Sequence, residues 1–401
     1  MNILEEIQNC PVEWKELGEV CELKNGYTPS KTNKEFWENG TIPWFRLEDI
    51  RKNGRVLSNS LQHVSRNAIK GGKVFTANSL IVSTTATIGE VALITVPFLC
   101  NQQITAVMIK QKYEKDLDIK FLFYYLQILS SDMKKGINEG SFPIVSLSKM
   151  RSFKIPIPPL KIQEKIVQIL DKFTEYVTEL TSELTSRKKQ YYFYRDKLLS
   201  FEDEVYQVEW KTLNECLKKG KGTKITASQM KLLHKEGAPI RIFAGGKTYA
   251  DVNYGDIPDK DIHTEEAIVV KSRGIIDFEY CTEPFSFKNE FWSYSSDNEN
   301  INLRYIYHYL VHNKEYFQNI ANNMQMPQIS SNDTEKFKIP VPSLEIQSRI
   351  VQVLDNFDTV CNDLNIGLPR EIELRQKQYE YFREKLLTFV AEGEYTESRV
   401  E

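Results

Sequence analysis

The sequence is poor in the features that would place it in a membrane or in an oxidising compartment. No stretch approaches the roughly 18 uninterrupted apolar residues of a membrane-spanning helix. The opening residues, MNILEEIQNCPVEWK, lack the basic region and apolar run of a secretory signal. Six cysteines are spread along 401 residues without a C-x-x-C pair, which argues against a zinc site and a disulfide framework. We therefore expect a cytoplasmic protein whose reduced cysteines serve in packing.

The motifs of nucleotide and cofactor sites are also missing. The segment AGGKT (244–248) has Arg241 where the first glycine of a phosphate-binding loop belongs, so a turn is the better interpretation. There is no NPPY-like tetrapeptide of amino-methyltransferases and no glycine-rich cofactor loop after a strand. We expect no bound cofactor in this chain.

Two further arrangements of residues resemble a metal site or a nuclease site only in part. His308 and His312 are four residues apart on a predicted helix, yet Tyr124 and Ile128 occupy the corresponding places earlier in the chain, which favours packing over metal binding. The triplet EWK occurs twice without the neighbouring aspartates of a nuclease, so its tryptophan more simply anchors a strand. We predict no catalytic residue and no metal site.

What the sequence does contain is an internal repeat. Residues 153–173, FKIPIPPLKIQEKIVQILDKF, return as FKIPVPSLEIQSRIVQVLDNF at 337–357, with 14 of 21 positions identical at a shift of 184. The same shift pairs 118–126 with 302–310, and QYYFYRDKLLSF at 190–201 returns as QYEYFREKLLTF at a shift of 188. Each copy consists of a variable globular part, a proline-rich joint and a helix. Repeats of this size decide the architecture before any local assignment.

The helix after each joint shows the apolar spacing of a coiled coil. Apolar residues follow one another in steps of four and three, which predicts a seam against another helix. The seam residues are Ile162, Ile166, Ile169, Phe173, Tyr176 and Leu180 in the first copy, and Ile346, Ile350, Val353, Phe357, Val360 and Leu364 in the second. Because the chain must return after the first helix, we predict antiparallel pairing, with an interruption of the second helix at Pro369.

These patterns predict an α+β fold with approximate two-fold symmetry. Each globular part has short β-branched runs broken by Gly, Asn and Pro, which indicates a mixed or antiparallel sheet, followed by one apolar helix. We place a first globular domain at 1–155, a spacer helix at 156–203, a second domain at 204–339, a second spacer helix at 340–391 and a tail at 392–401.

The middles of the two globular parts differ, and they carry residues suited to contacts with nucleic acid. Asn, Gln and Arg can pair with base edges, while Lys, Ser and Thr can bind phosphates. The net charge of −3 shows no global excess of basic residues, so such contacts must come from local patches. The candidates are Lys24, Asn25, Tyr27, Thr28, Lys31, Arg46, Ser83, Thr84, Thr85, Asn101, Gln102 and Gln103 in the first copy, and Lys219, Lys221, Lys224, Lys247, Tyr249, Lys271, Arg273, Gln325 and Gln328 in the second.

The joint with its helix, the ending Q-Y-x-x-x-R-x-K-L-L and the alternation of two variable parts resemble the specificity subunit of type I restriction-modification enzymes along the whole chain. The resemblance implies two target recognition domains that each read half of a bipartite double-stranded DNA site. It also implies two modification subunits that bind S-adenosylmethionine, and, in a full complex, two restriction subunits that use ATP and Mg. The doubled ELTS at 179–186 is then expected to set the gap between the half-sites.

Two other classes of function stay open on the sequence. The chain could be a coiled-coil scaffold that does not read DNA, or a methyltransferase or nuclease in its own right. A shift assay on random-sequence duplexes distinguishes the first alternative, and methyl transfer by the purified chain would establish the second.

Overall fold

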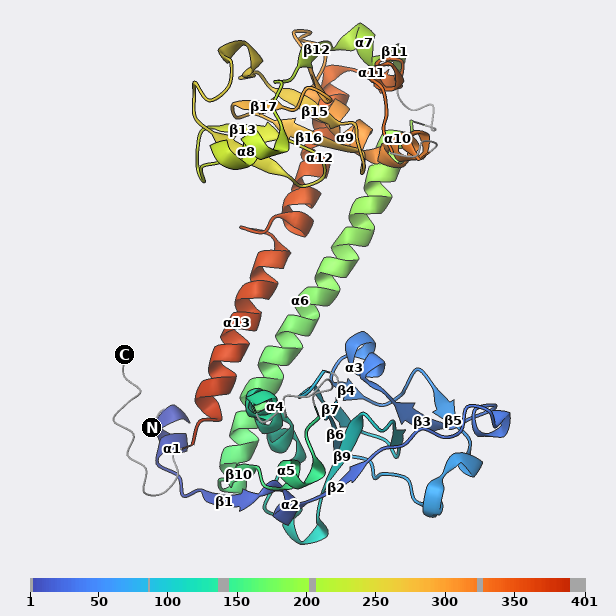
Figure 1. Cartoon of the computed structure of the whole chain (residues 1–401), viewed down its shortest axis with the longest axis vertical. Helices are drawn as coiled ribbons and strands as arrows, with labels where there is room; N and C mark the ends of the chain where they lie inside the picture. The colour runs from blue at the N-terminus through green and yellow to red at the C-terminus, as the bar shows by residue number, and fades with distance from the viewer. Residues whose placement is uncertain (1–2, 86, 136–143, 202–206, 323–326, 390–401) are drawn as a thin grey trace. The chain divides into compact units, whose positions relative to one another are not determined.

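The computed structural model describes residues 3–85, 87–135, 144–201, 207–322 and 327–389. The chain divides into two compact units (Figure 1). Unit 1 comprises Met1–Glu179 and Glu373–Glu401, and unit 2 comprises Leu180–Ile372. Each unit therefore contains one globular part, called here head 1 or head 2, together with helix segments from both copies of the repeat.

Head 1 is built on a five-stranded and a three-stranded sheet. The first has the order β2 (Cys21–Asn25), β9 (Ile104–Ile109), β6 (Ser79–Ser83), β7 (Val91–Ile94) and β4 (Val56–Leu57), and the second has the order β5 (His63–Val64), β3 (Ile42–Phe45) and β8 (Leu99–Cys100). The pairs β4–β7 and β3–β8 are parallel and the others antiparallel, so both sheets are mixed. The helices are α1 (Ile3–Gln8), α2 (Leu17–Val20), α3 (Leu47–Asn53), α4 (Ile119–Lys135) and α5 (Leu147–Arg151), with 3-10 turns at Lys34–Phe36, Arg66–Ala68, Lys70–Gly72 and Gln111–Tyr113.

Head 2 repeats this plan with fewer strands. Its sheets have the orders β12 (Lys218–Lys221), β18 (Trp292–Ser295), β15 (Ala267–Lys271) and β16 (Asp277–Cys281), and β14 (Tyr249–Val252), β13 (Ile240–Phe243) and β17 (Phe285–Phe287). Its helices are α7 (Leu213–Cys216), α8 (Ala227–Leu233), α9 (Leu303–His312), α10 (Lys314–Ala321) and α11 (Ser331–Glu335), with a 3-10 turn at Asp259–Asp261. The predicted α+β class with two similar domains is confirmed.

The proline-rich joints are extended, as their sequence predicts. In unit 1 the joint strand β10 (Lys154–Ile157) pairs antiparallel with β1 (Glu13–Glu16), with Trp14 opposite Pro156. In unit 2, β19 (Lys338–Val341) pairs in the same way with β11 (Glu209–Thr212). The tryptophan of each EWK triplet thus belongs to a strand that fixes the joint.

A buried glutamine directly after each joint ties the joint, the helix and the head together. Gln163 is fully buried; its Nε2 donates to the carbonyls of Asp116 (2.7 Å) and Pro158 (2.8 Å), and its Oε1 accepts from the amide of Asp118 (2.8 Å). Gln347 repeats all three bonds in unit 2, to Asn300 (3.0 Å), Pro342 (2.8 Å) and Asn302 (2.9 Å). We call these two residues the joint glutamines.

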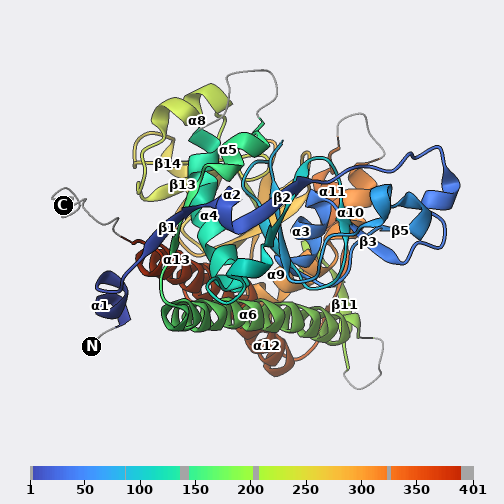
Figure 2. The same ribbon diagram turned by 90° about the horizontal axis from the view of Figure 1, so that it is seen from below.

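An aspartate eight residues, or about two helical turns, after each joint glutamine supplies a second attachment. Asp171 accepts from Tyr124 (2.6 Å) and pairs with Lys120 (2.6 Å), so α4 lies against the spacer helix α6 (Leu160–Ser200), as Figures 1 and 2 show. In unit 2 the equivalent Asp355 pairs with His308 (2.7 Å) and Arg304 (2.9 Å). His308 therefore takes the place of Tyr124, and burial lowers its pKa.

Within each unit, a spacer helix of the first copy of the repeat packs against one of the second copy. In unit 1, Phe173 of α6 stacks on Phe382 of α13 (Leu368–Leu386), with ring centroids 5.3 Å apart. In unit 2 the equivalent Phe357, on α12 (Leu344–Asn362), stacks on Tyr194 of α6 at 5.8 Å. We call these two contacts the aromatic rungs. Three residues after Phe173 on α6, Tyr176 contacts Arg375, which precedes Phe382 on α13. The two helices therefore run in opposite directions, and the predicted antiparallel pairing is confirmed.

The predicted seam is correct in its period and at most of its positions, including Phe173, Leu180 and Phe357, but it is wrong at Tyr176, Val353, Val360 and Leu364. In α12 the buried positions are Gln347, Ile350, Leu354 and Cys361, whereas Val353 and Val360 are exposed and Leu364 lies past the helix end. In α6 the same shift replaces Tyr176, which is 41% exposed, by the half-buried Val177. Apolar residues at adjacent positions made both choices compatible with the sequence, and only the packing of the folded chain selects between them.

The second spacer is two helices, as the proline predicts. α12 ends at Asn362 and α13 begins at Leu368, with Pro369 in its first turn, where a missing amide hydrogen costs nothing. The first spacer is one helix of 41 residues.

We expect the substitution Gln163→Ala to destabilise unit 1 by about 2 kcal/mol, because it leaves the buried carbonyl of Pro158 and the partly buried amide of Asp118 and carbonyl of Asp116 without this partner. Differential scanning calorimetry measures the effect, with Gln168→Ala, an exposed glutamine of the same helix, as the matched control. Equal unfolding temperatures for the two variants would show that the joint glutamine does not hold the head to the helix.

Candidate nucleic-acid interface

In head 1 three chain segments meet at one polar corner. They are the end of β2 with residues 25–28, the turn 101–104 after β8, and the start of the loop between β6 and β7. The amide of Tyr27 donates to Cys100 (2.8 Å), and the amide of Thr84 donates to Gln103 (3.0 Å). We call this arrangement corner 1.

Gly26 allows the close approach on which corner 1 depends. A Cβ atom at this position would lie 2.2 Å from the carbonyl oxygen of Cys100 and 2.3 Å from that of Asn101. These distances are far below van der Waals contact, and the obstacle is backbone that cannot swing away. The glycine of the sequence KNGYT is therefore required for packing.

The side chains of corner 1 form hydrogen bonds with one another. Thr28 donates to Oε1 of Gln102 (2.5 Å), and Nδ2 of Asn101 donates to Oε1 of Gln103 (3.1 Å). These residues come from two different segments, so the network fixes the segments' relative positions.

Asn25 is joined to the same corner through β9. Thr105 donates to its Oδ1 (2.8 Å) and lies 3.5 Å from the hydroxyl of Thr84. Seven of the predicted candidates, all uncharged amides or hydroxyls, are thus brought together. They are Asn25, Thr28, Thr84, Thr85, Asn101, Gln102 and Gln103.

Head 2 builds the same corner from different residues. The amide of Thr223 donates to Phe287 (2.8 Å), as Tyr27 does to Cys100, and a Cβ on Gly222 would lie 2.3 Å from the Phe287 oxygen. The hydroxyl of Ser272 donates to the carbonyl of Glu290 (2.8 Å), as that of Thr84 does to Gln103 at the longer distance of 3.4 Å. We call this arrangement corner 2.

Corner 2 differs from corner 1 in charge. Lys221 occupies the place of Asn25, and Lys288 and Glu290, which form an ion pair at 2.6 Å, occupy those of Asn101 and Gln103. Of these only Lys221 was predicted. The sequence did not predict the turn residues Lys288, Asn289 and Glu290, because the middle parts of the two heads differ in length. Only the matching hydrogen bonds show that residues 101–103 correspond to 288–290, at a shift of 187.

In both heads the hairpin beside the corner pairs with the segment that leads to the last short helix. Thr85 forms a β-bridge with Ile144, and Arg273 forms one with Gln328, at the shifts of 188 and 184 found in the repeat. The exposed Arg273 is thereby placed next to corner 2. Gln325, another candidate, lies outside the described residues.

Four candidates, Tyr27, Lys219, Ser83 and Lys271, are engaged by other residues of the chain. Tyr27 bridges Ala68 and the amide of Lys70 (2.8 and 2.9 Å), and Lys219 binds Ser331 and Glu335 of α11 (both 2.7 Å). Ser83 is fully buried and accepts from the amide of Glu90 (2.8 Å).

Lys271 is the clearest correction. It is 2% exposed, and its ammonium group binds Glu279 (2.5 Å) and the carbonyl of Gly246 (2.9 Å). A buried, paired lysine cannot reach a phosphate without breaking these contacts. Its partner was hidden from the sequence because the pair depends on the arrangement of the folded sheet.

The remaining candidates lie on exposed or half-buried surface. Lys24 pairs with Glu22 (2.6 Å) and Arg46 with Glu48 (3.0 Å), while Tyr249 carries the guanidinium of Arg241 over its ring at 4.2 Å. The exposed lysines without an ion pair among the described residues are Lys31, Lys224 and Lys247. Lys247 belongs to AGGKT, which is the turn between β13 and β14, as predicted.

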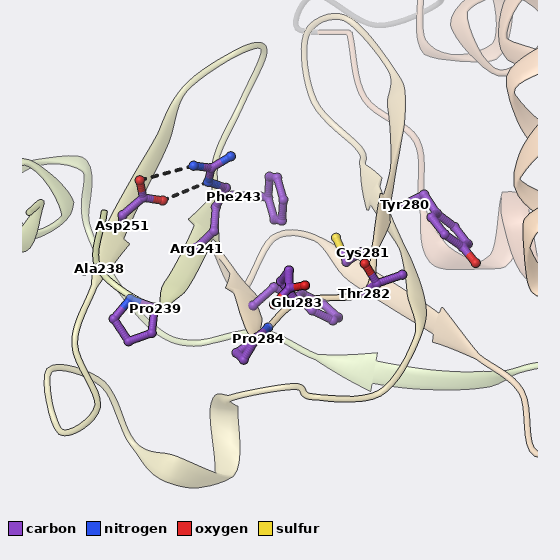
Figure 3. Close-up of a pocket in the computed structure, with 11 residues that line it drawn as sticks. Ala238, Pro239, Arg241, Phe243, Asp251, Tyr280, Cys281, Thr282, Glu283 and Pro284 are labelled. Atoms are coloured by element: carbon purple, nitrogen blue, oxygen red, sulfur yellow. Dashed lines mark hydrogen bonds and ion pairs between the residues drawn. The ribbon is translucent and has the colours of Figure 1, made fainter. Parts of the chain in front are cut away.

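A pocket of about 380 Å³ lies beside β13 and β17 in head 2. Figure 3 shows Arg241 and Asp251 facing each other at its edge, joined at 2.8 and 3.2 Å. Because this guanidinium is already engaged by a carboxylate and by Tyr249, it acts as a brace and offers few free donors to a ligand. We therefore place the candidate site at the corners.

The groups that would serve catalysis are engaged or buried. No cluster of metal-ligating side chains is found among the residues that the structure describes. His312 lies 3.4 Å from Asp196, and Lys15 pairs with Glu13 of its own triplet (2.5 Å). Burial raises the pKa of Cys21 and Cys281 to about 12, so these thiols stay protonated. Five of the six cysteines are buried, as packing residues should be.

Comparison with known proteins agrees with the repeat. The family model "Type I restriction modification DNA specificity domain" matches twice, at residues 11–187 and 206–374. The chain belongs to the family of type I specificity subunits. The EcoprrI specificity subunit of Escherichia coli is 40% identical over 369 residues, 88% of this chain and 89% of that one. The EcoR124I/EcoR124II specificity subunit of the same species is 37% identical over 295 residues, 68% and 71% of the two chains.

The fold agrees as well. The crystal structure of the type I S subunit from M. genitalium superposes with a TM-score of 0.63 at 16% identity and covers 96% of this chain and 98% of that one. The specificity subunit thus contains two DNA specificity domains, each with one corner, and a scaffold without DNA reading is not favoured. In the described part of the specificity subunit, no helix is long and apolar enough to cross a membrane.

Proposed function

We propose that the specificity subunit reads a bipartite double-stranded DNA site, one half with each head, through the two corners. The observation that carries the proposal is that corner 1 and corner 2 share the backbone hydrogen bonds made by Tyr27 and Thr223 and those that anchor and close the turns after β8 and β17, but differ in their side chains. A common frame with exchanged side chains is what two readers of different sequences require, because backbone geometry positions a protein and side chains specify bases.

The corners differ in the bases they suit. At corner 1 the exposed amides are Asn25 and Gln102, which suit adenine edges and phosphates, whereas Thr84 and Asn101 are buried and support them. Corner 2 adds the exposed Lys221 and Arg273, which suit guanine edges and phosphates. The candidate phosphate contacts beside them are Lys24, Lys31, Arg46, Lys224, Lys247 and Tyr249.

The spacer helix fixes the gap between the half-sites in this proposal. Helix α6 runs without interruption through its 41 residues, or about 60 Å, and ELTSELTS lies inside it. Leu180 and Leu184 are half-buried, and Glu179 and Glu183 are exposed. One four-residue unit advances a helix by about 6 Å and turns it by about 40°, so a unit can be added with the seam almost in phase.

Inserting a third ELTS after Ser186 should lengthen the unspecified gap by about one or two base pairs and leave both half-sequences unchanged, given about 3.4 Å per base pair. Methylome sequencing of cells that carry the eight-residue and twelve-residue versions measures the gap directly. An active twelve-residue protein that methylates the original motif would show that these residues do not set the spacing.

The specificity subunit itself does no chemistry in this proposal. Methyl transfer belongs to two modification subunits, which supply S-adenosylmethionine, and cleavage belongs to two restriction subunits, which supply ATP and Mg where they are present. Sharing phosphate contacts with these partners suits a chain of net charge −3. The complex works in the cytoplasm, where its DNA is found.

The aromatic rungs leave an exposed aromatic residue beside them that suits a partner helix. Phe193 is 62% exposed and Tyr381 is 57% exposed, at equivalent positions of the repeat, each directly before the rung residue. Large exposed aromatics at matching places in both units are typical of interaction surfaces. We assign them to docking of the two modification subunits, one in each unit.

Replacing Phe193 with Ser should weaken assembly with one modification subunit, and replacing Tyr381 with Ser should weaken assembly with the other. Each single variant should then shift the complex from two modification subunits to one in native mass spectrometry. Gln190→Ser, a polar exposed position on the same helix, is the control. Retention of two modification subunits by the double variant would exclude this surface.

A further inference from the structure

We infer that a single exposed amide at the tip of each corner, Gln102 in head 1 and Asn289 in head 2, reads an adenine in its half-site. The inference rests on the proposed function, because it names the residue and the base within the same two corners. It separates one base-reading side chain in each head from neighbours whose task is to hold the tip.

The two residues occupy the same place in the same turn. Each is the second residue after a strand, β8 in head 1 and β17 in head 2. The turn is anchored at its first residue, whose amide donates at 3.1 Å to the strand beside it: Asn101 to Phe45, and Lys288 to Phe243. It closes on itself, with Ile104 donating to Asn101 (3.2 Å) and Phe291 to Lys288 (2.9 Å).

The neighbours of the tip residue are paired with each other in both heads. Asn101 binds Gln103 at 3.1 Å, and Lys288 binds Glu290 at 2.6 Å. The chemistry of the pair differs, one amide with amide and the other ammonium with carboxylate, but both pairs flank the tip residue. Such a pair ties together the residues before and after the tip, so it positions the tip.

The tip residue is the most exposed of the three turn residues in each head. Gln102 and Asn289 are exposed, while the residues on either side are buried or half-buried. Thr28 donates to one lone pair of the Gln102 oxygen, which leaves the second lone pair and both amide hydrogens available. Within the described residues the Asn289 side chain makes no hydrogen bond.

A primary amide has the groups that an adenine edge needs. Its oxygen accepts from N6 and its nitrogen donates to N7, and Asn or Gln makes this bidentate contact with adenine in the major groove. A phosphate would use only the donor half of the amide. The different lengths of Gln102 and Asn289 are compatible with the same contact, since the adjoining segments differ between the heads.

The test uses the complex of the specificity subunit with its modification subunits. Its motif is first mapped by methylome sequencing, and binding is then measured on the mapped duplex and on duplexes with one base pair replaced at a time. Gln102→Ala should reduce discrimination at one A·T pair of one half-site by about 5- to 140-fold, the range of a bidentate contact. Asn289→Ala should do the same in the other half-site, so each variant is a control for the other.

Gln111→Ala, at an exposed glutamine elsewhere in head 1, should leave the discrimination at every base pair unchanged. Gln102→Glu, which keeps the size but removes the donor, should lose adenine and favour a cytosine N4 donor. An equal fall in affinity for every duplex would overturn the inference, because it indicates a phosphate contact or a damaged head. Unchanged discrimination between the mapped duplex and its single-base-pair variants would overturn it as well. A wild-type motif without two halves would instead refute the proposed function.

Discussion

The structure depends on helix contacts that each unit obtains from both copies of the repeat. Phe173 of the first copy stacks on Phe382 of the second in unit 1, and Phe357 of the second stacks on Tyr194 of the first in unit 2. A spacer helix that leaves its head exposes an apolar face, and the other copy of the repeat supplies a matching one. Each head is then bound to its helix by the same joint glutamine and the same aspartate, so the repeat fixes how the two heads are held.

The two heads share this frame, and at the corners they differ in their side chains while the backbone of the turn is alike. Gly26 and Gly222 permit the same close approach, and the turns after β8 and β17 close with the same hydrogen bonds. Asn101 and Gln103 in head 1 are replaced by Lys288 and Glu290 in head 2, and in both heads these two residues flank the tip residue and bind each other. If the corners read DNA as proposed, substitution at a few positions would give such a protein a new half-site, because backbone geometry positions a protein and side chains specify bases.

Much of the fold followed from the sequence, because the repeat, the helical period and the prolines are local or long-range patterns of the chain itself. The break before Pro369 and the extended joints are examples. The phase of the seam was not predictable, because Tyr176 and Val177 are both apolar and only packing chooses between them. In the candidate site, the amides of corner 1 were found as a patch, but Lys271 was misplaced and Asn289 was missed. Lys271 depends on a pairing across the neighbouring strands β15 and β16, and Asn289 on contacts between segments far apart in the chain, and composition reveals neither.

The central claim is that each head reads its own half of the DNA site. The direct measurement is methylome sequencing of a host that carries this chain with residues 20–115 replaced by the corresponding part of another family member. The account predicts that one half of the methylated motif changes, while the other half and the gap are kept. A motif in which both halves change, or neither, would contradict it.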